Sequence, residues 1–216
     1  MCAEPTLRIS EIFVSIQGES TRVGLPTVFV RLIGCPLRCV WCDTEYAFTG
    51  GQLMSFADIL AQVKQHRVPT VCVTGGEPLA QKNCLLLLRA LCDAGFSVSL
   101  ETSGALDVSA VDARVSKIMD LKAPGSGEVD KNRLQNLAHL TARDEIKLVL
   151  ADEADYRWAC SMLSEHDLAA RCTVLFSPVQ GQLSPAALAE WIVRDALPVR
   201  MQLQLHKVIW GNVPGR

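Results

Sequence analysis

Short apolar runs alternate along the chain with longer segments in which apolar residues recur every three or four positions. The short runs are rich in valine, isoleucine and leucine, and several are almost uninterrupted. Such runs are typical of strands that are buried on both faces of a parallel sheet. We predict strands over residues 9–16, 27–33, 70–74, 97–101, 117–121, 145–150, 173–176 and 201–205.

The longer segments carry the start and stop signals of helices. Ser55 followed three residues later by Asp58 predicts a helix start, and Ser184 followed by Pro185 predicts another. Gly95 predicts the end of the helix before it, because glycine readily adopts the left-handed conformation that ends helices. Apolar residues at helical spacing predict helices near residues 56–63, 84–92, 134–138, 154–162 and 185–192, whereas residues 124–127 predict a loop.

Strands that alternate with helices form right-handed βαβ units around a mostly parallel sheet. We therefore predict an α/β fold, in the form of an open, partial (β/α) barrel. A length of 216 residues fits one domain, so we expect residues 1–216 to form it. In a barrel of this kind, functional groups lie on loops at the carboxyl ends of the strands.

The composition excludes several classes of protein. Hydrophobic residues make up 49% of the chain and charged residues 20%, which is enough apolar material for a sizeable core. A net charge of −2 argues against nucleic acid as the main partner. The amino terminus lacks a signal-peptide pattern, and no apolar run approaches the ~20 residues of a membrane helix. We predict a cytoplasmic protein with no membrane association.

Three of the nine cysteines lie within one short segment. Cys35, Cys39 and Cys42 have the spacing C-x3-C-x2-C directly after a predicted strand, so a loop can turn three thiolates toward one centre. Soft thiolates select zinc or iron–sulfur clusters. A structural zinc site needs four ligands, and no nearby cysteine or histidine completes the set. Three ligands on a 4Fe–4S cluster leave one iron open for chemistry. Buried structural cysteines and a zinc site with a distant fourth ligand remain alternatives.

A second motif, Thr74-Gly75-Gly76-Glu77-Pro78, lies between a predicted strand and a helix. Two adjacent glycines allow the backbone to approach a ligand closely, although an ordinary turn would use the same residues. Polar residues also follow three other predicted strands, and these are Ser103, Lys122 and the pair Ser177 and Gln180. A solvated strand end is the alternative for each of them.

The cysteine loop resembles the signature of the radical S-adenosylmethionine superfamily, in which an aromatic residue, here Trp41, precedes the last cysteine. The resemblance implies a 4Fe–4S cluster whose open iron binds the amino and carboxylate groups of S-adenosylmethionine. It also implies that the Gly-Gly-Glu-Pro element holds the methionine amino group. The expected cofactor-binding residues are Trp41, Gly75, Gly76, Glu77, Ser103, Lys122, Ser177 and Gln180.

The segment Ser15-Ile16-Gln17-Gly18-Glu19 carries a carboxylate beside a glycine. One carboxylate accepts two hydrogen bonds from a guanidine-like edge, such as that of a pterin or a guanine. Arg31 has a planar fork of donors that suits a substrate carboxylate. The alternative for both Glu19 and Arg31 is a charged side chain that is exposed to solvent on the surface.

With these residues included, the chain resembles the 7-carboxy-7-deazaguanine synthase family, a group of radical enzymes with a trimmed barrel core. The matching pieces run from Ser-Ile-Gln-Gly-Glu to a Gln204-Leu205-His206-Lys207 segment near the carboxyl end. The resemblance implies a carbon–nitrogen lyase that converts 6-carboxy-5,6,7,8-tetrahydropterin to 7-carboxy-7-deazaguanine, with loss of ammonia, in queuosine biosynthesis. The expected substrate-binding residues are Gln17, Gly18, Glu19, Arg31, Thr74 and His206.

The same resemblance implies further partners. Family enzymes use Mg²⁺, with a residue at the position of Thr44 as a ligand, and a hydroxyl oxygen suits this hard cation. An electron donor such as flavodoxin or ferredoxin and a homodimer are also expected. We place His206 at the end of the last strand, and we expect the segment after Lys207, through residue 212, to cover the substrate.

Two other functions use the same cysteine loop. A glycyl-radical-enzyme activase would act on a partner protein, and Glu19, Arg31 and Thr44 would then have no small anionic substrate to hold. A non-catalytic iron–sulfur or zinc-binding module would hold a metal centre that does not respond to S-adenosylmethionine.

Overall fold

The computed structural model describes residues 4–211, 213 and 215. The described strands form one nine-stranded sheet in the order β3-β1-β2-β4-β5-β6-β7-β8-β9. Neighbours from β2 to β9 are parallel, whereas β1 is antiparallel to both β2 and β3. The predicted open α/β fold is confirmed. The strands are β1 (Thr6–Ile16), β2 (Pro26–Leu32), β3 (Gln52–Ser55), β4 (Thr70–Gly75), β5 (Ser97–Thr102), β6 (Ser116–Asp120), β7 (Glu145–Leu150), β8 (Thr173–Pro178) and β9 (Arg200–Met201).

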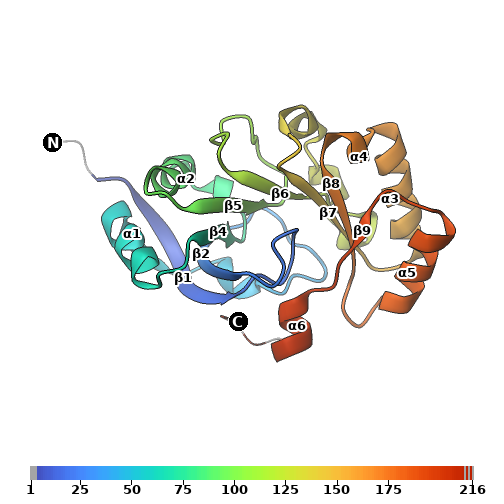
Figure 1. Cartoon of the computed structure of the whole chain (residues 1–216), viewed down its shortest axis with the longest axis horizontal. Coiled ribbons are helices and arrows are strands. Elements are labelled where there is room, and N and C mark those ends of the chain that lie inside the picture. The colour runs from blue at the N-terminus through green and yellow to red at the C-terminus, as the bar shows by residue number, and fades with distance from the viewer. Residues whose placement is uncertain (1–3, 212, 214, 216) are drawn as a thin grey trace.

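The helices divide between the two faces of this sheet. Helices α1 and α2 pack on the first half of the sheet, and α3, α4 and α5 pack on the second half. Helix α6 lies on the side opposite to α2 (Figure 1). No helix among the described residues has the length and apolarity needed to cross a lipid bilayer. The helices are α1 (Phe56–Gln65), α2 (Cys84–Asp93), α3 (Glu153–Glu165), α4 (Leu168–Arg171), α5 (Pro185–Arg194) and α6 (Leu205–Trp210).

Local signals in the sequence fix several helix ends. The Ser55 side chain accepts a hydrogen bond from the Asp58 backbone nitrogen, which confirms the predicted start of α1. Gly95 has φ +88° and follows the end of α2, as predicted. Ser184 is the N-cap of α5 and Pro185 occupies its first turn, which confirms the predicted helix start, although the Ser184 side chain makes no capping hydrogen bond.

The two faces of each central strand have different roles. Val28, Val30 and Leu32 of β2 pack under the helices, whereas Phe29 and Arg31 face the other way and line a cavity. This alternation follows from the two-residue period of a strand. The same alternation recurs in β4, β5, β6 and β7. The second face is therefore covered, as predicted, but it carries polar groups that the apolar runs did not reveal.

The loop between β1 and β2 (residues 17–25) crosses the amino edge of the sheet. The Arg22 guanidinium donates hydrogen bonds to the Ser97 and Ser116 hydroxyls at 3.3 and 3.2 Å, and these are the first residues of β5 and β6. Functional residues on this loop therefore enter the inner face from the amino edge. The prediction that all functional groups lie at the carboxyl ends of the strands is wrong for this loop.

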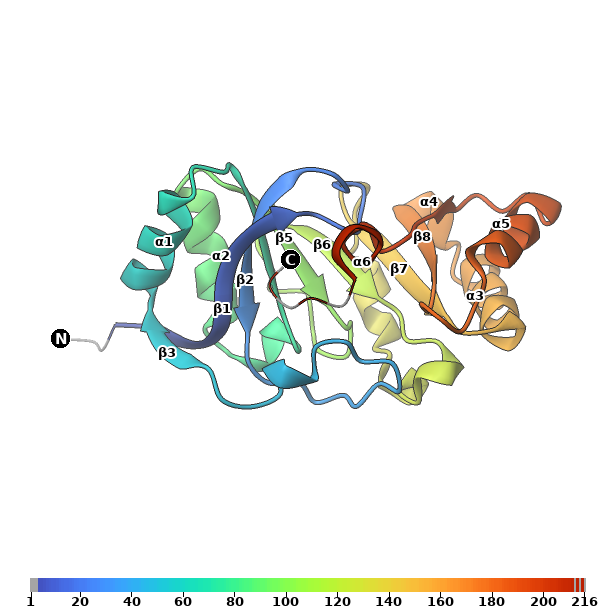
Figure 2. The same ribbon diagram turned by 90° about the horizontal axis from the view of Figure 1, so that it is seen from below.

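The carboxyl-terminal part differs most from the prediction. Strand β9 contains only Arg200 and Met201, and helix α6 begins at Leu205, so the predicted strand over residues 201–205 is wrong. After β9 the chain turns across the inner face, because the Leu205 backbone nitrogen donates to the Gly18 carbonyl oxygen at 2.9 Å. This contact replaces further pairing with β8. Figure 2 shows α6 crossing in front of the middle of the sheet.

Three smaller differences also have local causes. The edge strand β3 was not predicted, because a run of four residues, Gln52–Ser55, gives a weak pattern. The segment Leu134–His139 is a 3₁₀ helix rather than an α-helix. On α3, Ala154 is exposed and the buried face includes Asp155 and Tyr156, so the predicted stripe is rotated by about one residue.

Asn136 holds the segment that follows β5. Its Nδ2 donates to the carbonyl oxygens of Gly104 and Leu106 at 2.9 and 2.8 Å, and its Oδ1 accepts from the Val108 backbone nitrogen at 3.2 Å. The side chain is completely buried, and the Leu106 oxygen and the Val108 nitrogen depend on it, whereas the Gly104 oxygen also accepts from the Arg133 backbone nitrogen at 3.3 Å.

Replacing Asn136 by alanine should lower the free energy of unfolding by about 2–4 kcal/mol, because the Leu106 oxygen and the Val108 nitrogen lose their partner and the amide's bond to the Gly104 oxygen is lost as well. For a chain of this length, that loss corresponds to a melting temperature lower by roughly 5–10 °C. Thermal unfolding followed by circular dichroism measures this shift.

The neighbouring Gln135→Ala substitution is a matched control. Gln135 is exposed, so its removal should change the free energy of unfolding by no more than about 0.5 kcal/mol. Equal melting temperatures for the two variants would contradict the role assigned to Asn136.

Candidate active site

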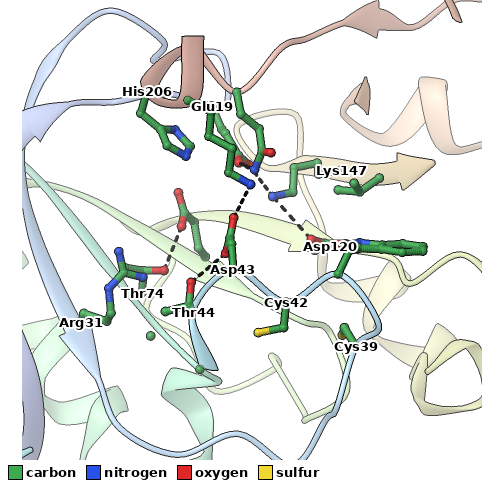
Figure 3. Close-up of a pocket in the computed structure, with 18 of the residues that line it drawn as sticks. Glu19, Arg31, Cys39, Cys42, Asp43, Thr44, Thr74, Asp120, Lys147 and His206 are labelled. Carbon is green, nitrogen blue, oxygen red and sulfur yellow. Dashed lines mark hydrogen bonds and ion pairs between the residues drawn. The ribbon is translucent and has the colours of Figure 1, made fainter. Parts of the chain in front are cut away.

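A cavity of about 600 Å³ opens on the inner face of the sheet. The cysteine loop (residues 34–43) forms one wall of it, and the 17–25 loop together with α6 forms the opposite wall (Figure 3). Strands β2, β4, β5, β6 and β7 supply the wall between them. Cavities of this size hold small molecules and cofactors.

The cysteine loop places Cys35, Cys39 and Cys42 on the same cavity wall. Its turn is fixed by backbone hydrogen bonds, in which Cys42 donates to the Cys39 oxygen and Val40 donates to the Ser126 oxygen at 3.2 and 3.0 Å. Among the described residues, no three His, Cys, Asp or Glu side chains lie close enough to bind one metal ion. A cubic cluster separates its corner ligands more widely than one ion does, so three spaced thiols facing one cavity fit a 4Fe–4S cluster.

The Gly-Gly-Glu-Pro element packs directly against the cysteine loop. A Cβ atom on Gly76 would lie 2.4 Å from the Gly34 oxygen and 2.7 Å from the Cys35 Cβ, so only glycine fits there. The Glu77 backbone nitrogen donates to the Gly34 oxygen at 2.8 Å. The two motifs are therefore held together by close backbone contact.

The Glu77 side chain does not line the cavity. It is completely buried and accepts hydrogen bonds from the Thr102 hydroxyl and from the backbone and hydroxyl of Ser103. Glu77 thus orients Ser103, which does line the cavity. Ser177 also turns away, because its hydroxyl donates to the Gln202 carbonyl oxygen at 2.7 Å. The other six predicted cofactor-binding residues line the cavity, and these are Trp41, Gly75, Gly76, Ser103, Lys122 and Gln180.

Asp120 contributes an unusual acceptor near the cysteine loop. Its Oδ2 contacts the Lys122 ammonium at 3.1 Å, whereas its Oδ1 is buried with no hydrogen-bond partner among the described residues. A buried carboxylate oxygen without a donor is costly, and a donor on a bound molecule would satisfy it. This observation fits a cofactor that carries hydroxyl or amino groups.

All six predicted substrate-binding residues line the same cavity. Four of them lie on the 17–25 loop or on α6, which form one wall of the cavity. The other two, Arg31 and Thr74, lie on β2 and β4. Arg31 and Thr74 are register partners in the parallel sheet, so their side chains emerge next to each other. The six residues are Gln17, Gly18, Glu19, Arg31, Thr74 and His206.

Glu19 lies deep in the cavity and is paired. The Lys147 ammonium contacts its Oε2, and the Gln204 Nε2 donates to its Oε1 at 2.5 Å. Burial alone would raise the pKa of Glu19, but Lys147 and Gln204 outweigh that effect and lower the pKa. Glu19 is therefore a carboxylate at neutral pH and keeps acceptor capacity on both oxygens.

His206 packs on Gly18. A Cβ atom on Gly18 would lie 2.0 Å from the His206 Nδ1, so the imidazole occupies the space that a larger residue would fill. The sequence predicted His206 at the end of the last strand. The structure instead has it in helix α6. Burial lowers the pKa of His206, although the Glu19 charge opposes the shift, and the ring is neutral near pH 7.

Two contacts hold the 17–25 loop in place. Ser20 has φ +69°, and its backbone nitrogen and oxygen bind the amide group of Gln202 at 2.6 and 2.7 Å. Thr21 donates from its backbone and hydroxyl to Glu145 at 2.9 and 2.5 Å. The loop that carries Glu19 is therefore fixed by β7 and by the segment after β9.

Arg31 is held from behind. Its Nε donates to the Glu11 Oε1 at 2.8 Å, and its guanidinium carbon lies 5.8 Å from the ring centres of Phe13 and Tyr46. The terminal nitrogens of the fork point into the cavity (Figure 3). Nearby, the Thr44 hydroxyl donates to the Asp43 Oδ1 at 2.8 Å.

Asp43 joins the cysteine loop to α6. Its Oδ2 contacts the Lys207 ammonium at 2.5 Å. Burial raises the pKa of Asp43, but Lys207 more than offsets it, so that the pKa falls to about 2. Gly211, Val213 and Gly215 also line the cavity, so the segment after Lys207 borders it as expected, whereas residue 212 lies outside the described residues.

Sequence reasoning missed several polar cavity residues, among them Glu101, Asp120, Lys147 and Gln204. Lys147 is the clearest case, because it interrupts the apolar run Ile146-Lys147-Leu148-Val149 in a buried strand. A charge at such a position is rarely accidental, since an isolated buried charge is costly. That signal was present in the sequence.

Comparison with known proteins agrees with this geometry. The model of the radical SAM superfamily matches residues 30–124. The 7-carboxy-7-deazaguanine synthase of Chlorobaculum tepidum is 51% identical over 214 residues, covering 98% of this chain and 97% of that protein. The Koribacter versatilis protein of the same name is 43% identical over 220 residues, covering 94% and 97%.

Solved structures show the same fold. The crystal structure of QueE from Escherichia coli has a TM-score of 0.77 at 24% identity and covers 93% of this chain and 95% of that one. Streptococcus suis SuiB bound to S-adenosylmethionine has a TM-score of 0.55 at 14% identity, covering 78% of this chain and 44% of that one. Both likenesses concern the fold alone.

Fold, cysteine loop and superfamily match define a radical S-adenosylmethionine protein. The 51% sequence identity over nearly the whole length also identifies the family within this superfamily. The chain belongs to the 7-carboxy-7-deazaguanine synthase family.

The Cys42→Ala substitution tests the cluster site. The parent protein, reconstituted without oxygen, should bind about four irons per chain. The variant should retain less than half of that iron, because a cluster with two protein ligands is held poorly. Iron analysis and electron paramagnetic resonance of the reduced proteins measure the difference.

Cys92→Ala is the matched control. Cys92 lies on α2 as a partly buried thiol outside the cavity, so its replacement should leave the iron content unchanged. A full complement of iron in Cys42→Ala would show that the cluster is held elsewhere.

Proposed function

We propose that this chain is a carbon–nitrogen lyase that converts 6-carboxy-5,6,7,8-tetrahydropterin to 7-carboxy-7-deazaguanine and ammonia in queuosine biosynthesis. The observation that carries the proposal is the union, in one cavity, of three cluster-ligand cysteines with Glu19 and Arg31. Full-length similarity to proteins named for this activity supports it. Residues 1–216 act as one domain in this proposal.

The cluster and S-adenosylmethionine together supply the 5′-deoxyadenosyl radical. With these groups bound, hydrogen would be taken from C6 of the pterin and later returned, the ring would contract, and ammonia would leave. The protein binds, orients and excludes water around these partners. Gly75, Gly76 and Ser103 lie beside the cysteine loop and are placed to bind the cofactor.

The two ends of the pterin are recognised by opposite charges. The Glu19 carboxylate accepts hydrogen bonds from the guanidine-like edge of the pterin ring. Arg31, whose Nε is fixed by Glu11, presents its terminal nitrogens to the substrate carboxylate. Thr74 shares its register position with Arg31, and its hydroxyl donates to Glu101 at 2.8 Å. This contact supports a position for Glu101 beside the substrate in the proposal.

Magnesium is part of the proposal. The Thr44 hydroxyl lies in the cavity near Arg31, so one protein oxygen and the substrate carboxylate would share the cation. Mg²⁺ keeps several waters and needs few protein ligands, which suits this sparse site.

The remaining partners follow from the chemistry and the family. Reduction of the cluster requires a low-potential donor such as a reduced flavodoxin or ferredoxin. A homodimer is the expected assembly, and light scattering of the purified protein measures it. A cytoplasmic location is proposed as well.

The activase and the non-catalytic module have less support. An activase acts on a polypeptide and needs no buried carboxylate and guanidinium in its cavity, whereas Glu19 and Arg31 are both inside it. A passive metal-binding module would not explain a cavity of about 600 Å³ beside the cysteines.

An anaerobic product assay tests the function. The reconstituted protein is incubated with the carboxytetrahydropterin, S-adenosylmethionine and a reductant, with and without Mg²⁺. We expect 7-carboxy-7-deazaguanine and ammonia in equal amounts, with more product when Mg²⁺ is present. Absence of any 7-deazapurine, in a preparation whose cluster signal responds to S-adenosylmethionine, would contradict the proposal.

The Glu19→Ala substitution should raise the KM for the pterin by roughly 10–100-fold, because hydrogen bonds to a charged group contribute about 1.5–3 kcal/mol. The iron content should not change, because Glu19 is not near a cluster ligand in sequence and lies on the opposite wall. Steady-state kinetics and iron analysis measure the two quantities.

Glu165→Ala, an exposed glutamate at the end of α3, is the control and should leave the KM unchanged. An unaltered KM in Glu19→Ala would remove the role given to this carboxylate.

A further inference from the structure

Lys147 is a charged residue on an otherwise apolar strand. Its neighbours Ile146 and Leu148 pack under the helices, so the two-residue period of β7 turns Lys147 to the cavity. Its side chain is only 13% exposed. A lysine in such a place needs partners for its charge.

Two carboxylates provide those partners. The Lys147 ammonium contacts the Glu19 Oε2, and it lies 3.4 Å from the Asp120 Oδ2 (Figure 3). Burial would lower the pKa of Lys147, but Glu19 and Asp120 raise it well above its usual value, so the group is charged. An ammonium has three donors, and two carboxylates leave one donor for the cavity.

Further contacts of Glu19 and Asp120 hold the two carboxylates and Lys147 in fixed positions. Gln204 donates to the second oxygen of Glu19, and Lys122 contacts Asp120 at 3.1 Å. Asp120 and Lys147 are register partners on adjacent strands, so their separation is set by the sheet. The cavity therefore presents a carboxylate acceptor and an ammonium donor side by side in fixed positions.

This order of groups matches one edge of a 2-amino-4-oxopyrimidine ring. Along that edge the ring presents an amino group, a ring N–H and then a carbonyl oxygen. A carboxylate accepts from the first two, and a donor beside the carboxylate meets the third. The pair Glu19 and Lys147 supplies both in that order.

We propose that Lys147 is a specificity-determining residue that donates a hydrogen bond to the C4 carbonyl oxygen of the pterin while Glu19 accepts from the adjacent amino and N3–H groups. The inference rests on the proposed function, because it assigns the pterin edge to Glu19. A 4-amino ring would place donors against the Lys147 donor and would leave the ammonium without its third partner.

The test compares two ligands that bind but do not react. These are 6-carboxypterin, with a 4-oxo group, and 2,4-diaminopteridine-6-carboxylate, with a 4-amino group. Their dissociation constants are measured by calorimetry with reconstituted protein and S-adenosylmethionine near pH 7, where the diamino ring is uncharged and the 4-oxo ring keeps its N3–H. The parent protein should prefer the 4-oxo ligand by at least about tenfold, the effect expected of one hydrogen bond to a charged group.

Lys147→Met keeps the length of the side chain but removes the donor, so the preference should fall by about tenfold, and any preference that remains comes from the N3–H that only the 4-oxo ring presents to Glu19. Lys147→Arg keeps a donor and should retain most of the preference. Lys82→Met, at an exposed lysine outside the cavity, should behave like the parent protein. Iron content and cleavage of S-adenosylmethionine without pterin show that each variant is folded and loaded.

The change in the preference ratio between the parent protein and Lys147→Met is the decisive readout, because the N3–H contact with Glu19 is the same in both proteins and only the Lys147 donor differs. An unchanged ratio in Lys147→Met, or no preference in the parent protein, would overturn the role of Lys147 and leave the proposed function standing. Failure of the parent protein to bind either ligand would instead overturn the function and, with it, this inference.

Discussion

The site depends on one constraint, which is the register of parallel strands whose inner faces each carry a polar residue at a similar level. Arg31 pairs in register with Thr74, and Asp120 pairs with Lys147. Hydrogen bonds of the sheet fix these levels, and the apolar residues on the other face hold the sheet against the helices. A slip of one residue in any central strand would exchange a cavity group for a core group. Packing on one face therefore determines chemistry on the other.

Much of the fold was predictable because its signals are local. Period-two and period-3.6 patterns, the Ser55 cap and the Gly95 stop depend on neighbours in sequence, and the structure has them. The cysteine loop was predictable for the same reason, since its three cysteines lie within eight residues. The features that were predicted wrongly, such as the length of β9, depend on contacts between residues far apart in the chain. Residues after β9 leave the sheet to meet Gly18, and no local pattern contains that information.

The residues of the candidate site also fall into two groups, those that the sequence indicates and those that only the structure reveals. Glu19 and Arg31 were found by chemistry and resemblance, but the sequence did not show that Lys147 is the partner of Glu19. Glu77 is the opposite case, because a motif suggested a ligand contact and the structure shows a buried carboxylate that holds Ser103. A motif identifies a segment more reliably than it identifies which atom of that segment faces the ligand.

The contact between Gly18 and the segment before α6 also has a consequence for the order in which the site is made. During synthesis the cysteine loop leaves the ribosome before Gln202, which clamps Ser20, and before Gln204, which pairs with Glu19. The nascent chain thus has its cluster ligands long before it has the far wall. The wall of the cavity that carries Glu19 is therefore complete only after that later segment has docked on the 17–25 loop.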